Sequence, residues 1–451
     1  MRDDARLDLV PRREAFLWWL KLGFINFGGP AGQIAVMHEE LVDRRRWISN
    51  DRFLHALNFC MLLPGPEAQQ LAIYVGWLLN GTMGGIVAGV LFVLPAFFLI
   101  LGLSWTYAVH GDVTWVAAVF YGLRSAVIGL VAAAVIRVGA KALKTRPAWA
   151  VAAAALVAIF FFQVPFPLIV LGAAIVGLVG ARTNPGAWRT EGHGSVDGDT
   201  AVIDDDTVHG RAEPSWRRSV RVLALGLAIW WGPLLLVLAV RGTDDTLSKE
   251  ALFFSQAAMV TFGGAYAVLS YINQAAVQQF GWLAPGQMVT GLGLAESTPG
   301  PLIMVTEFVG FLGGYNLPGG LDPVVAGILG ATVTTWATFA PCFLWIFLGA
   351  PFIERLRGNK GLSAALSAIT AAVVGVILNL AVTFAAFALF DGVRRGRLGG
   401  AEFPLPDLST IDLFAAVLAI GSFVALWRYR VNVLLVVLTC AAAGLVYRLV
   451  F

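Results

Sequence analysis

A proline-glycine-proline triplet interrupts an apolar run at two places in this chain, Pro64-Gly65-Pro66 and Pro299-Gly300-Pro301. Proline lacks a backbone N–H and clashes with the preceding helical turn, so a continuous helix is not expected to pass through either triplet. A lipid core offers no hydrogen bonds, and broken backbone at that depth needs protection by protein or a cavity. The two triplets therefore predict interrupted helices in the interior, around which two halves of the chain are built.

The apolar runs indicate a polytopic α-helical membrane protein that lies in a lipid bilayer. Of the 451 residues, 58% are hydrophobic and 13% are charged, whereas a soluble protein carries about 25% charged residues. Many runs reach the roughly 18–20 apolar residues that cross a bilayer. They are continuous rather than alternating, which argues against a transmembrane barrel. The basic residues lie between apolar runs, so the net charge of +3 is no argument for a nucleic-acid partner.

The sequence predicts neither an enzyme nor a metal or cofactor site. Cys60, Cys342 and Cys440 all lie in apolar runs and form no C-x-x-C pair, so disulfides and zinc are not expected. The chain has no H-E-x-x-H, G-x-S-x-G or Walker motif. Active transport by such a chain would draw on an ion gradient or a membrane potential. The N-terminus has no short apolar stretch with a cleavage site, and we expect no cleaved signal peptide.

The runs divide the chain into six segments. They are a cytoplasmic N-terminus (1–14), a first transmembrane repeat (15–181), a cytoplasmic linker (182–220), a connecting transmembrane helix (221–240), a second transmembrane repeat (251–390) and a C-terminal loop with further helices (391–451). The linker is polar, has no apolar period and is predicted to be disordered. The number of full spans stays open between about 9 and 13.

The two halves share landmarks at a fixed spacing. Three of them recur 235 positions later: Gly29 as Gly264, Trp47 as Trp282, and Pro64 as Pro299. Further on, Pro95 and Gly129 recur 246 positions later as Pro341 and Gly375, which indicates 11 extra residues near Gly313–Asp322. A long internal repeat in a membrane protein is typical of a transporter built from two structural copies.

The distribution of basic residues favours copies of opposite orientation. Arg44-Arg45-Arg46 corresponds to the uncharged Gln279-Phe280-Gly281, and the turn His110-Gly111-Asp112 corresponds to the more basic Glu354–Lys360. Lysine and arginine gather in cytoplasmic loops, so this complementarity predicts two inverted copies.

Re-entrant broken helices would give a topology that fits most of the basic residues. Three basic segments fall in the cytoplasm: Arg12–Arg13, Arg44–Arg46 and Lys141–Arg146. The same topology puts Arg394, Arg395 and Arg397 outside, which the rule does not explain. Broken helices that span the membrane fully are the alternative.

The helix breaks are the predicted binding site. The start of a half-helix presents free N–H groups and a positive dipole end, which together bind anions. The predicted binding residues are the break residues and the polar side chains beside them: Asn26, Gly28, Gly29, Gln33, Pro64, Gly65, Pro66, Gln69, Gln70, Thr261, Gly263, Gly264, Ser297, Thr298, Pro299, Gly300 and Pro301. The alternative is that these prolines merely kink packed helices.

Four charged residues within apolar runs need a reason to be there. Arg124, alone in the run 113–137, is either a fixed cation for an oxyanion in the binding site or a side chain that reaches an interface. Glu67, Glu296 and Glu307 flank the breaks. Each is either a protonatable coupling group or a structural residue, and Glu67 would also suit a helix N-terminus.

Several of these stretches resemble the chromate transporter (CHR) family, in its long two-domain form, over about residues 15–390. The motifs that carry the resemblance are Phe27-Gly28-Gly29-Pro30, Arg45-Arg46-Trp47, Leu63-Pro64-Gly65-Pro66-Glu67-Ala68-Gln69-Gln70, Val260-Thr261-Phe262-Gly263-Gly264-Ala265-Tyr266 and Glu296-Ser297-Thr298-Pro299-Gly300-Pro301-Leu302. The motifs are specific and occur in both halves.

The resemblance implies a bacterial inner-membrane protein that exports chromate, is driven by the membrane potential or the proton-motive force, and confers chromate resistance. Sulfate is a tetrahedral dianion like chromate and is a natural competitor or alternative substrate. We therefore predict a secondary transporter of tetrahedral oxyanions, with chromate first. The alternatives are uptake of sulfate-like anions and a passive anion channel. The coupling ion, the direction of transport and the oligomeric state, a homodimer among the options, stay open.

Overall fold

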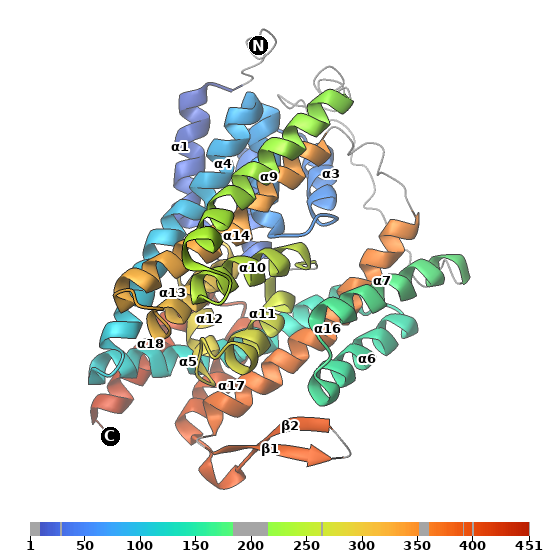
Figure 1. Cartoon of the computed structure of the whole chain (residues 1–451). Helices are drawn as coiled ribbons and strands as arrows, with labels where there is room; N and C mark the ends of the chain where they lie inside the picture. The colour runs from blue at the N-terminus through green and yellow to red at the C-terminus, as the bar shows by residue number, and fades with distance from the viewer. Residues whose placement is uncertain are drawn as a thin grey trace.

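The computed structural model describes residues 10–27, 29–183, 215–262, 265–350, 360–390, 392–398 and 401–450. Over these residues the chain is a bundle of helices with one two-stranded hairpin (Figure 1). Seven of the described helices are long and apolar enough to cross a membrane. The prediction of an all-α polytopic membrane protein is confirmed.

The first half of the chain alternates short helices with long ones. Its helices are α1 (Arg12–Ile25), α2 (Gly29–His38), the π-helical turn η1 (Glu39–Arg44), α3 (Asn50–Cys60), α4 (Glu67–His110), α5 (Thr114–Ala142), α6 (Arg146–Phe162), α7 (Phe166–Thr183) and α9 (Trp216–Arg241). The first two pieces are too short to cross a core of about 30 Å alone, at about 1.5 Å per residue.

The second half begins with the same order of elements. It consists of α10 (Thr246–Met259), α11 (Ala265–Gln274), the π-helical turn η3 (Ala275–Gln279), α12 (Gln287–Ser297), the 3₁₀ turn η4 (Leu302–Met304), α13 (Val305–Asn316), α14 (Pro323–Gly349), α16 (Lys360–Leu389), β1 (Val393–Leu398), β2 (Ala401–Pro406), the 3₁₀ turn η6 (Leu408–Thr410), α17 (Leu413–Trp427) and α18 (Val433–Val450).

In both halves a helical hairpin follows the proline-glycine-proline break, and the turn of the hairpin differs. In the first half α4 consists of two helices that meet at Asn80 and Gly81, where the backbone angles are not helical; the chain folds back there, because a Cβ atom added at Gly84 would lie 2.3 Å from the carbonyl oxygen of Gly76. In the second half α13 ends at Asn316, and residues 317–322 form a loop before α14. This loop occupies the stretch in which the spacing of the landmarks changes from 235 to 246.

The C-terminal helices pack closely on α5. A Cβ atom added at Gly122 of α5 would lie 2.0 Å from the carbonyl oxygen of Cys440, and one added at Gly444 would lie 2.6 Å from the backbone nitrogen of Gly122. Small residues at such points let two backbones approach each other, which is how membrane helices gain packing energy. The last turns of α18 therefore lie beside the first turns of α5.

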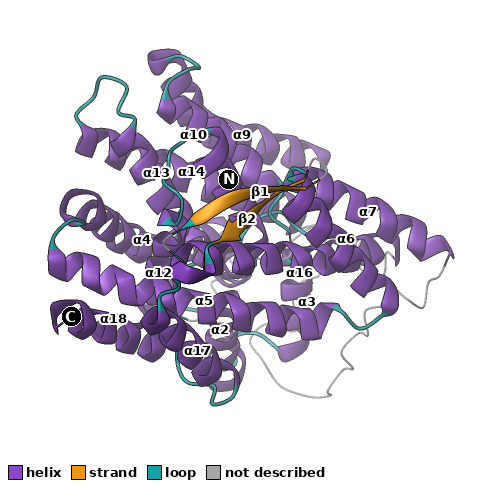
Figure 2. Ribbon diagram, turned by 90° about the horizontal axis from the view of Figure 1, so that it is seen from below, coloured by secondary structure: helices purple, strands orange, loops and turns teal. Residues whose placement is uncertain are grey.

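The hairpin of β1 and β2 was not expected from the sequence, which predicted a loop there. The strands pair antiparallel from Val393 opposite Pro406 to Leu398 opposite Ala401. Figure 2 shows the hairpin from below, across the end of the bundle near α6 and α16. It joins the end of α16 to the start of α17, and it carries the basic residues Arg394, Arg395 and Arg397.

Several predictions lie outside the described residues. They concern residues 1–9 of the N-terminus, most of the linker 182–220, and Arg355 and Arg357 of the basic loop in the second half. Three predicted binding glycines lie there too: Gly28, Gly263 and Gly264.

Candidate functional site

The two helix breaks contact each other through a pair of matching backbone hydrogen bonds. The N–H of Gly65 donates to the carbonyl of Thr261 at 2.9 Å, and the N–H of Gly300 donates to the carbonyl of Asn26 at 3.3 Å. Residues 26 and 261 are 235 positions apart, and so are residues 65 and 300. Each half of the chain thus uses its own proline-glycine-proline break to bind the glycine-rich break of the other half.

Glycine is required at both of these positions. Gly65 has φ +123 and Gly300 has φ +122, a region that side-chain-bearing residues rarely adopt. A Cβ atom at Gly65 would lie 2.9 Å from Cys342 Sγ and from Gln70 Nε2. A Cβ atom at Gly300 would lie 2.3 Å from the Cβ of Ala96. In the sequence these glycines stood out because prolines flank them. The structure shows why glycine is needed at both positions, since a side chain there would be strained and would clash.

Buried amide side chains surround the breaks. Gln33 Nε2 donates to the carbonyls of Asn26, at 3.1 Å, and Gly300, at 2.5 Å. Gln70 Nε2 donates to the carbonyl of Pro64 at 2.8 Å, and Gln69 Nε2 donates to the carbonyl of Gly89 at 3.4 Å. Gln33 and Gln70 therefore fix backbone carbonyls at the breaks, whereas Gln69 bonds a carbonyl within α4.

Asn26 differs from the other amides, because neither its Nδ2 nor its Oδ1 has a hydrogen-bond partner among the described residues. The residue is 0% exposed. A buried amide without partners costs roughly 1–3 kcal/mol, so an orphaned donor in a native interior calls for an explanation. Asn26 Nδ2 is an unused donor directly beside the backbone contact with Gly300.

The hydroxyl groups predicted for the site bond to their own helices. Thr261 Oγ1 donates to the carbonyl of Ala257 at 2.7 Å. Ser297 Oγ and Thr298 Oγ1 each donate to the carbonyl of Leu294 at 2.9 Å. These bonds satisfy carbonyls at the ends of α10 and α12. The three hydroxyl hydrogens are therefore used within the fold in this conformation.

The breaks also begin helices. Gly29 starts α2, and Pro64-Gly65-Pro66 leads directly into α4 at Glu67. In the second half Pro299-Gly300-Pro301 leads into η4 at Leu302. The first N–H groups of a helix have no partner within it, and they carry the positive end of the helix dipole. The starts of α2, α4 and η4 therefore place such backbone N–H groups next to the breaks.

The acidic residues near the breaks have different surroundings. Glu67 is half-buried at the first position of α4. Glu296 is 4% exposed and accepts a hydrogen bond from the hydroxyl of Tyr266. Glu307 on α13 is fully buried, and neither of its carboxylate oxygens has a hydrogen-bond partner in the part of the chain described.

Glu250 on α10 is a further buried carboxyl, and its burial was not predicted from the sequence. It is 0% exposed, and both its oxygens lack hydrogen-bond partners among the described residues. Its side chain fills the space left by two glycines, Gly313 on α13 and Gly330 on α14. The sequence does place an acidic residue here, at the edge of an apolar run. The charged neighbours Asp244, Asp245 and Lys249 made this edge resemble a membrane–water interface, so a buried carboxyl was not expected.

The structure does not bring Arg124 to the breaks. Arg124 Nε donates to Thr290 Oγ1 at 2.7 Å, and its guanidinium also donates to the Tyr107 hydroxyl at 3.2 Å. Thr290 lies on α12 seven positions before its last residue, Ser297, which corresponds to about 10 Å of helix, and Gly300 lies beyond that end. Arg124 instead lines a separate cavity of about 610 Å³.

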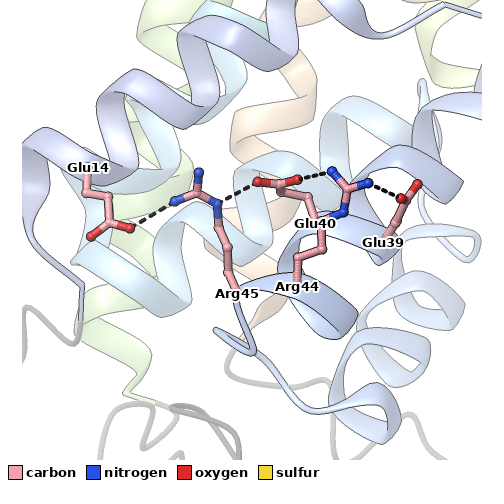
Figure 3. A network of polar contacts seen from close by, with 5 residues as sticks. All are labelled: Glu14, Glu39, Glu40, Arg44 and Arg45. Carbon is pink, nitrogen blue, oxygen red and sulfur yellow. Dashed lines mark hydrogen bonds and ion pairs between the residues drawn. The ribbon is translucent and has the colours of Figure 1, made fainter.

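A chain of ion pairs ties α1 to the turn after α2 (Figure 3). Arg45 pairs with Glu14 at 2.9 Å and with Glu40 at 2.8 Å, and Arg44 pairs with Glu39 at 2.7 Å and with Glu40 at 3.5 Å. In the sequence this arginine cluster served as a topological signal and as part of a family motif. The contacts give it a structural role at the end of the first broken helix.

The fold and the site together define a polytopic α-helical membrane protein whose broken helices meet in its interior. The family model described as "Chromate transporter" matches residues 13–178 and 249–445, which covers most of both halves. The chain therefore belongs to the chromate transporter family. This is a family of transporters and not of enzymes.

Three similar proteins match between 83% and 98% of this chain. A chromate transport protein of Pseudomonas aeruginosa is 32% identical over 451 residues, covering 98% of this chain and 94% of that protein. A chromate transport protein of Cupriavidus metallidurans is 29% identical and covers 84% of each chain. A probable chromate transport protein of Synechococcus elongatus is 31% identical, covering 83% of this chain and 84% of that protein. No solved structure shows a significant match.

Proposed function

We propose that this protein is a secondary transporter of tetrahedral oxyanions that exports chromate across the inner membrane of a bacterium and so confers chromate resistance. The membrane potential or the proton-motive force would drive the export, and sulfate would compete with chromate. Family membership and three relatives named for chromate transport support the substrate class. The observation that carries the site is the reciprocal contact between the two breaks.

The anion would bind where the breaks meet. Asn26 supplies an unused buried donor, and the first N–H groups of α4 and η4 add backbone donors. Donors fixed by the surrounding fold stabilise an anion without having to reorganise when it arrives. Gln33 and Gln70 would act by holding the breaks in shape, because their amide nitrogens bond break carbonyls.

Alternating access would come from two inverted copies that rock against each other. The packing of the two equivalent long helices supports the inversion. Gly85 of α4 lies against Phe347 of α14, and Gly89 lies against Phe343. Rising numbers on α4 meet falling numbers on α14, so the two helices run antiparallel. Copies related by an axis in the membrane plane would give this arrangement.

Coupling to protons would use the half-buried carboxyl of Glu67 and the buried carboxyls of Glu296 and Glu307. A carboxyl without a partner in a membrane interior is costly when charged, so it tends to change its protonation as its surroundings change. Glu307 fits this role best, because both its oxygens lack partners among the described residues.

Uptake of labelled chromate into inverted membrane vesicles tests the proposal, measured with and without an uncoupler and with excess sulfate. Gradient-driven export predicts uptake that the uncoupler abolishes and that sulfate inhibits. Uptake that persists unchanged after the gradient collapses would favour a passive channel, and uptake only into right-side-out vesicles would favour a sulfate-like importer. No uptake above empty vesicles would contradict chromate as the substrate.

Two variants test the placement of the site. Gly65→Leu should abolish chromate uptake without preventing insertion into the membrane, and wild-type uptake by this variant would refute the break site. Arg124→Gln tests whether Arg124 acts on the anion at all, and unchanged chromate binding and transport would remove Arg124 from the path.

A further inference from the structure

The cavity that contains Arg124 lies at the end of the molecule opposite to the ion pairs of Figure 3. In Figure 1, α1 begins at the upper end of the bundle, and the C-terminal end of α18 lies at the lower end. The cavity lies between the turn that joins α4 to α5, the end of α13 and the end of α18, and its lining includes Tyr107, Asp112, Tyr121, Arg124, Tyr315 and Arg448. Its volume of about 610 Å³ falls within the range of small-molecule sites, about 300–1,000 Å³.

Arg124 brings a positive charge into this cavity without a matching negative one. Its guanidinium bonds two neutral groups, the hydroxyls of Thr290 and Tyr107. Among the described residues no carboxylate lies within ion-pair distance of it. A charged side chain within a membrane helix is costly unless it meets an opposite charge or water. The two hydroxyls fix the guanidinium in position while leaving its charge available to an anion.

A second guanidinium, that of Arg448, lies at the mouth of the same cavity. It lies over the ring of Tyr121, 4.5 Å from the centroid. Tyr121 is itself held in place, because its hydroxyl donates to Asp412 Oδ2 at 2.6 Å. Arg448 belongs to α18, the last helix of the chain. It lies beyond residue 445, which is the last residue that the family model matches.

The rim also carries one negative group, the exposed Asp112 in the α4–α5 turn. The lining residues thus include two guanidinium groups and one carboxylate. A cleft with an excess of one sign of charge and low-dielectric walls concentrates ions of the opposite sign. An anion drawn in by Arg448 would reach Arg124 at the side of α12, the helix that leads to the break at Gly300.

We propose that this cavity is a second binding site for the transported oxyanion, a vestibule in series with the site at the breaks, to which the C-terminal helix α18 contributes Arg448. The inference rests on the proposed function, since it takes the same dianion as ligand. Arg124 acts as the inner cation of the vestibule and Arg448 as the outer one. Asp112 weakens the vestibule by repulsion.

Equilibrium binding of labelled chromate to the full chain in nanodiscs tests the vestibule, because both faces of the protein are then accessible. At low ionic strength the wild type should bind two chromate ions with different affinities. Arg448→Gln should weaken one of the two sites by about fivefold, the effect of one charge about 8 Å from a dianion in water. Asp112→Asn should strengthen the same site by a similar factor, and added salt should reduce both effects.

Three further variants make the outcomes distinguishable. Arg428→Gln is the matched control, because Arg428 follows α17 and does not line the cavity; it should change neither affinity. Gly65→Leu should remove the site at the breaks and leave the vestibule. Arg124→Gln should remove the vestibule and leave the site at the breaks. The exposed positions 112 and 448 keep the test valid if this variant of the half-buried Arg124 fails to fold.

Each result decides between the two proposals. A single chromate ion that Gly65→Leu removes, and that Arg448→Gln and Asp112→Asn leave unchanged, would overturn the vestibule and keep the proposed function. A single ion that responds to Arg448→Gln and not to Gly65→Leu would keep the vestibule and overturn the site at the breaks. No binding into the millimolar range would overturn both.

Discussion

Replacing Gly65 with alanine is expected to abolish transport while the protein still inserts into the membrane. At φ +123 a residue with a side chain is strained by about 1–3 kcal/mol. The new Cβ would also lie 2.9 Å from Cys342 Sγ and Gln70 Nε2, closer than ordinary van der Waals contact. Movement of Gly65 to relieve this contact would stretch its hydrogen bond to Thr261, worth about 1 kcal/mol net. The local cost is about 2–4 kcal/mol.

A matched control separates backbone strain from damage at the site. Gly242 has φ +76, and a Cβ added there would meet no heavy atom within 4 Å. Gly242→Ala should therefore carry a similar backbone penalty without a clash, in the loop after α9. Initial rates of chromate uptake, divided by the amount of protein in the membrane, should be lost in the first variant and kept in the second. Equal rates in the two variants would refute the reasoning.

Three further outcomes follow from the structure. Glu307→Gln should abolish gradient-driven accumulation of chromate while exchange across the membrane continues, and accumulation at the wild-type level would exclude Glu307 from coupling. Glu14→Gln should lower the free energy of unfolding in detergent by up to about 1 kcal/mol, and it should have less effect when Arg45 has already been replaced by Gln; purely additive effects of the two changes would contradict the ion pair. Arg46 has φ +52, and the equivalent residue of the second half is Gly281 at φ +66. Because this left-handed backbone suits glycine and disfavours a branched side chain, the Arg46→Gly variant should be more stable than Arg46→Val by about 1–2 kcal/mol. The reverse order of the two melting temperatures would argue against this reading of the backbone.

The positions of the helix breaks could be predicted from the sequence, because proline acts locally. Pro64, Gly65 and Pro66 together make a continuous helix very unfavourable, and the structure has its break there. Single prolines did not mark breaks, because Pro95 and Pro341 lie inside α4 and α14. The turn at Asn80 and Gly81 carries no proline, and apolar residues continue on both sides. The reversal of the chain there depends on close packing between the two helices of α4, such as Gly84 on Gly76, which the local sequence does not reveal.

Contacts between the halves could not be predicted in the same way. The repeat spacing made Gly65 and Gly300 equivalent, but it did not reveal that each of them bonds the opposite half. Arg124 stood out as a charge in an apolar run, and its cavity depends on α13 and α18, which lie far away in the sequence. Glu250 escaped notice because its burial comes from two glycines on other helices.

The most direct test of the account changes one atom at its centre. Asn26→Asp keeps the shape of the side chain and replaces the unpartnered Nδ2 donor by an oxygen, which would repel a dianion by several kcal/mol at close range. Asn432→Asp is the control, since Asn432 Oδ1 only accepts from the N–H of Leu434 at the start of α18. Chromate uptake into inverted vesicles should be lost in Asn26→Asp and kept in Asn432→Asp, with equal amounts of protein in the membrane. Uptake by Asn26→Asp with an unchanged KM would contradict an oxyanion site at the paired breaks.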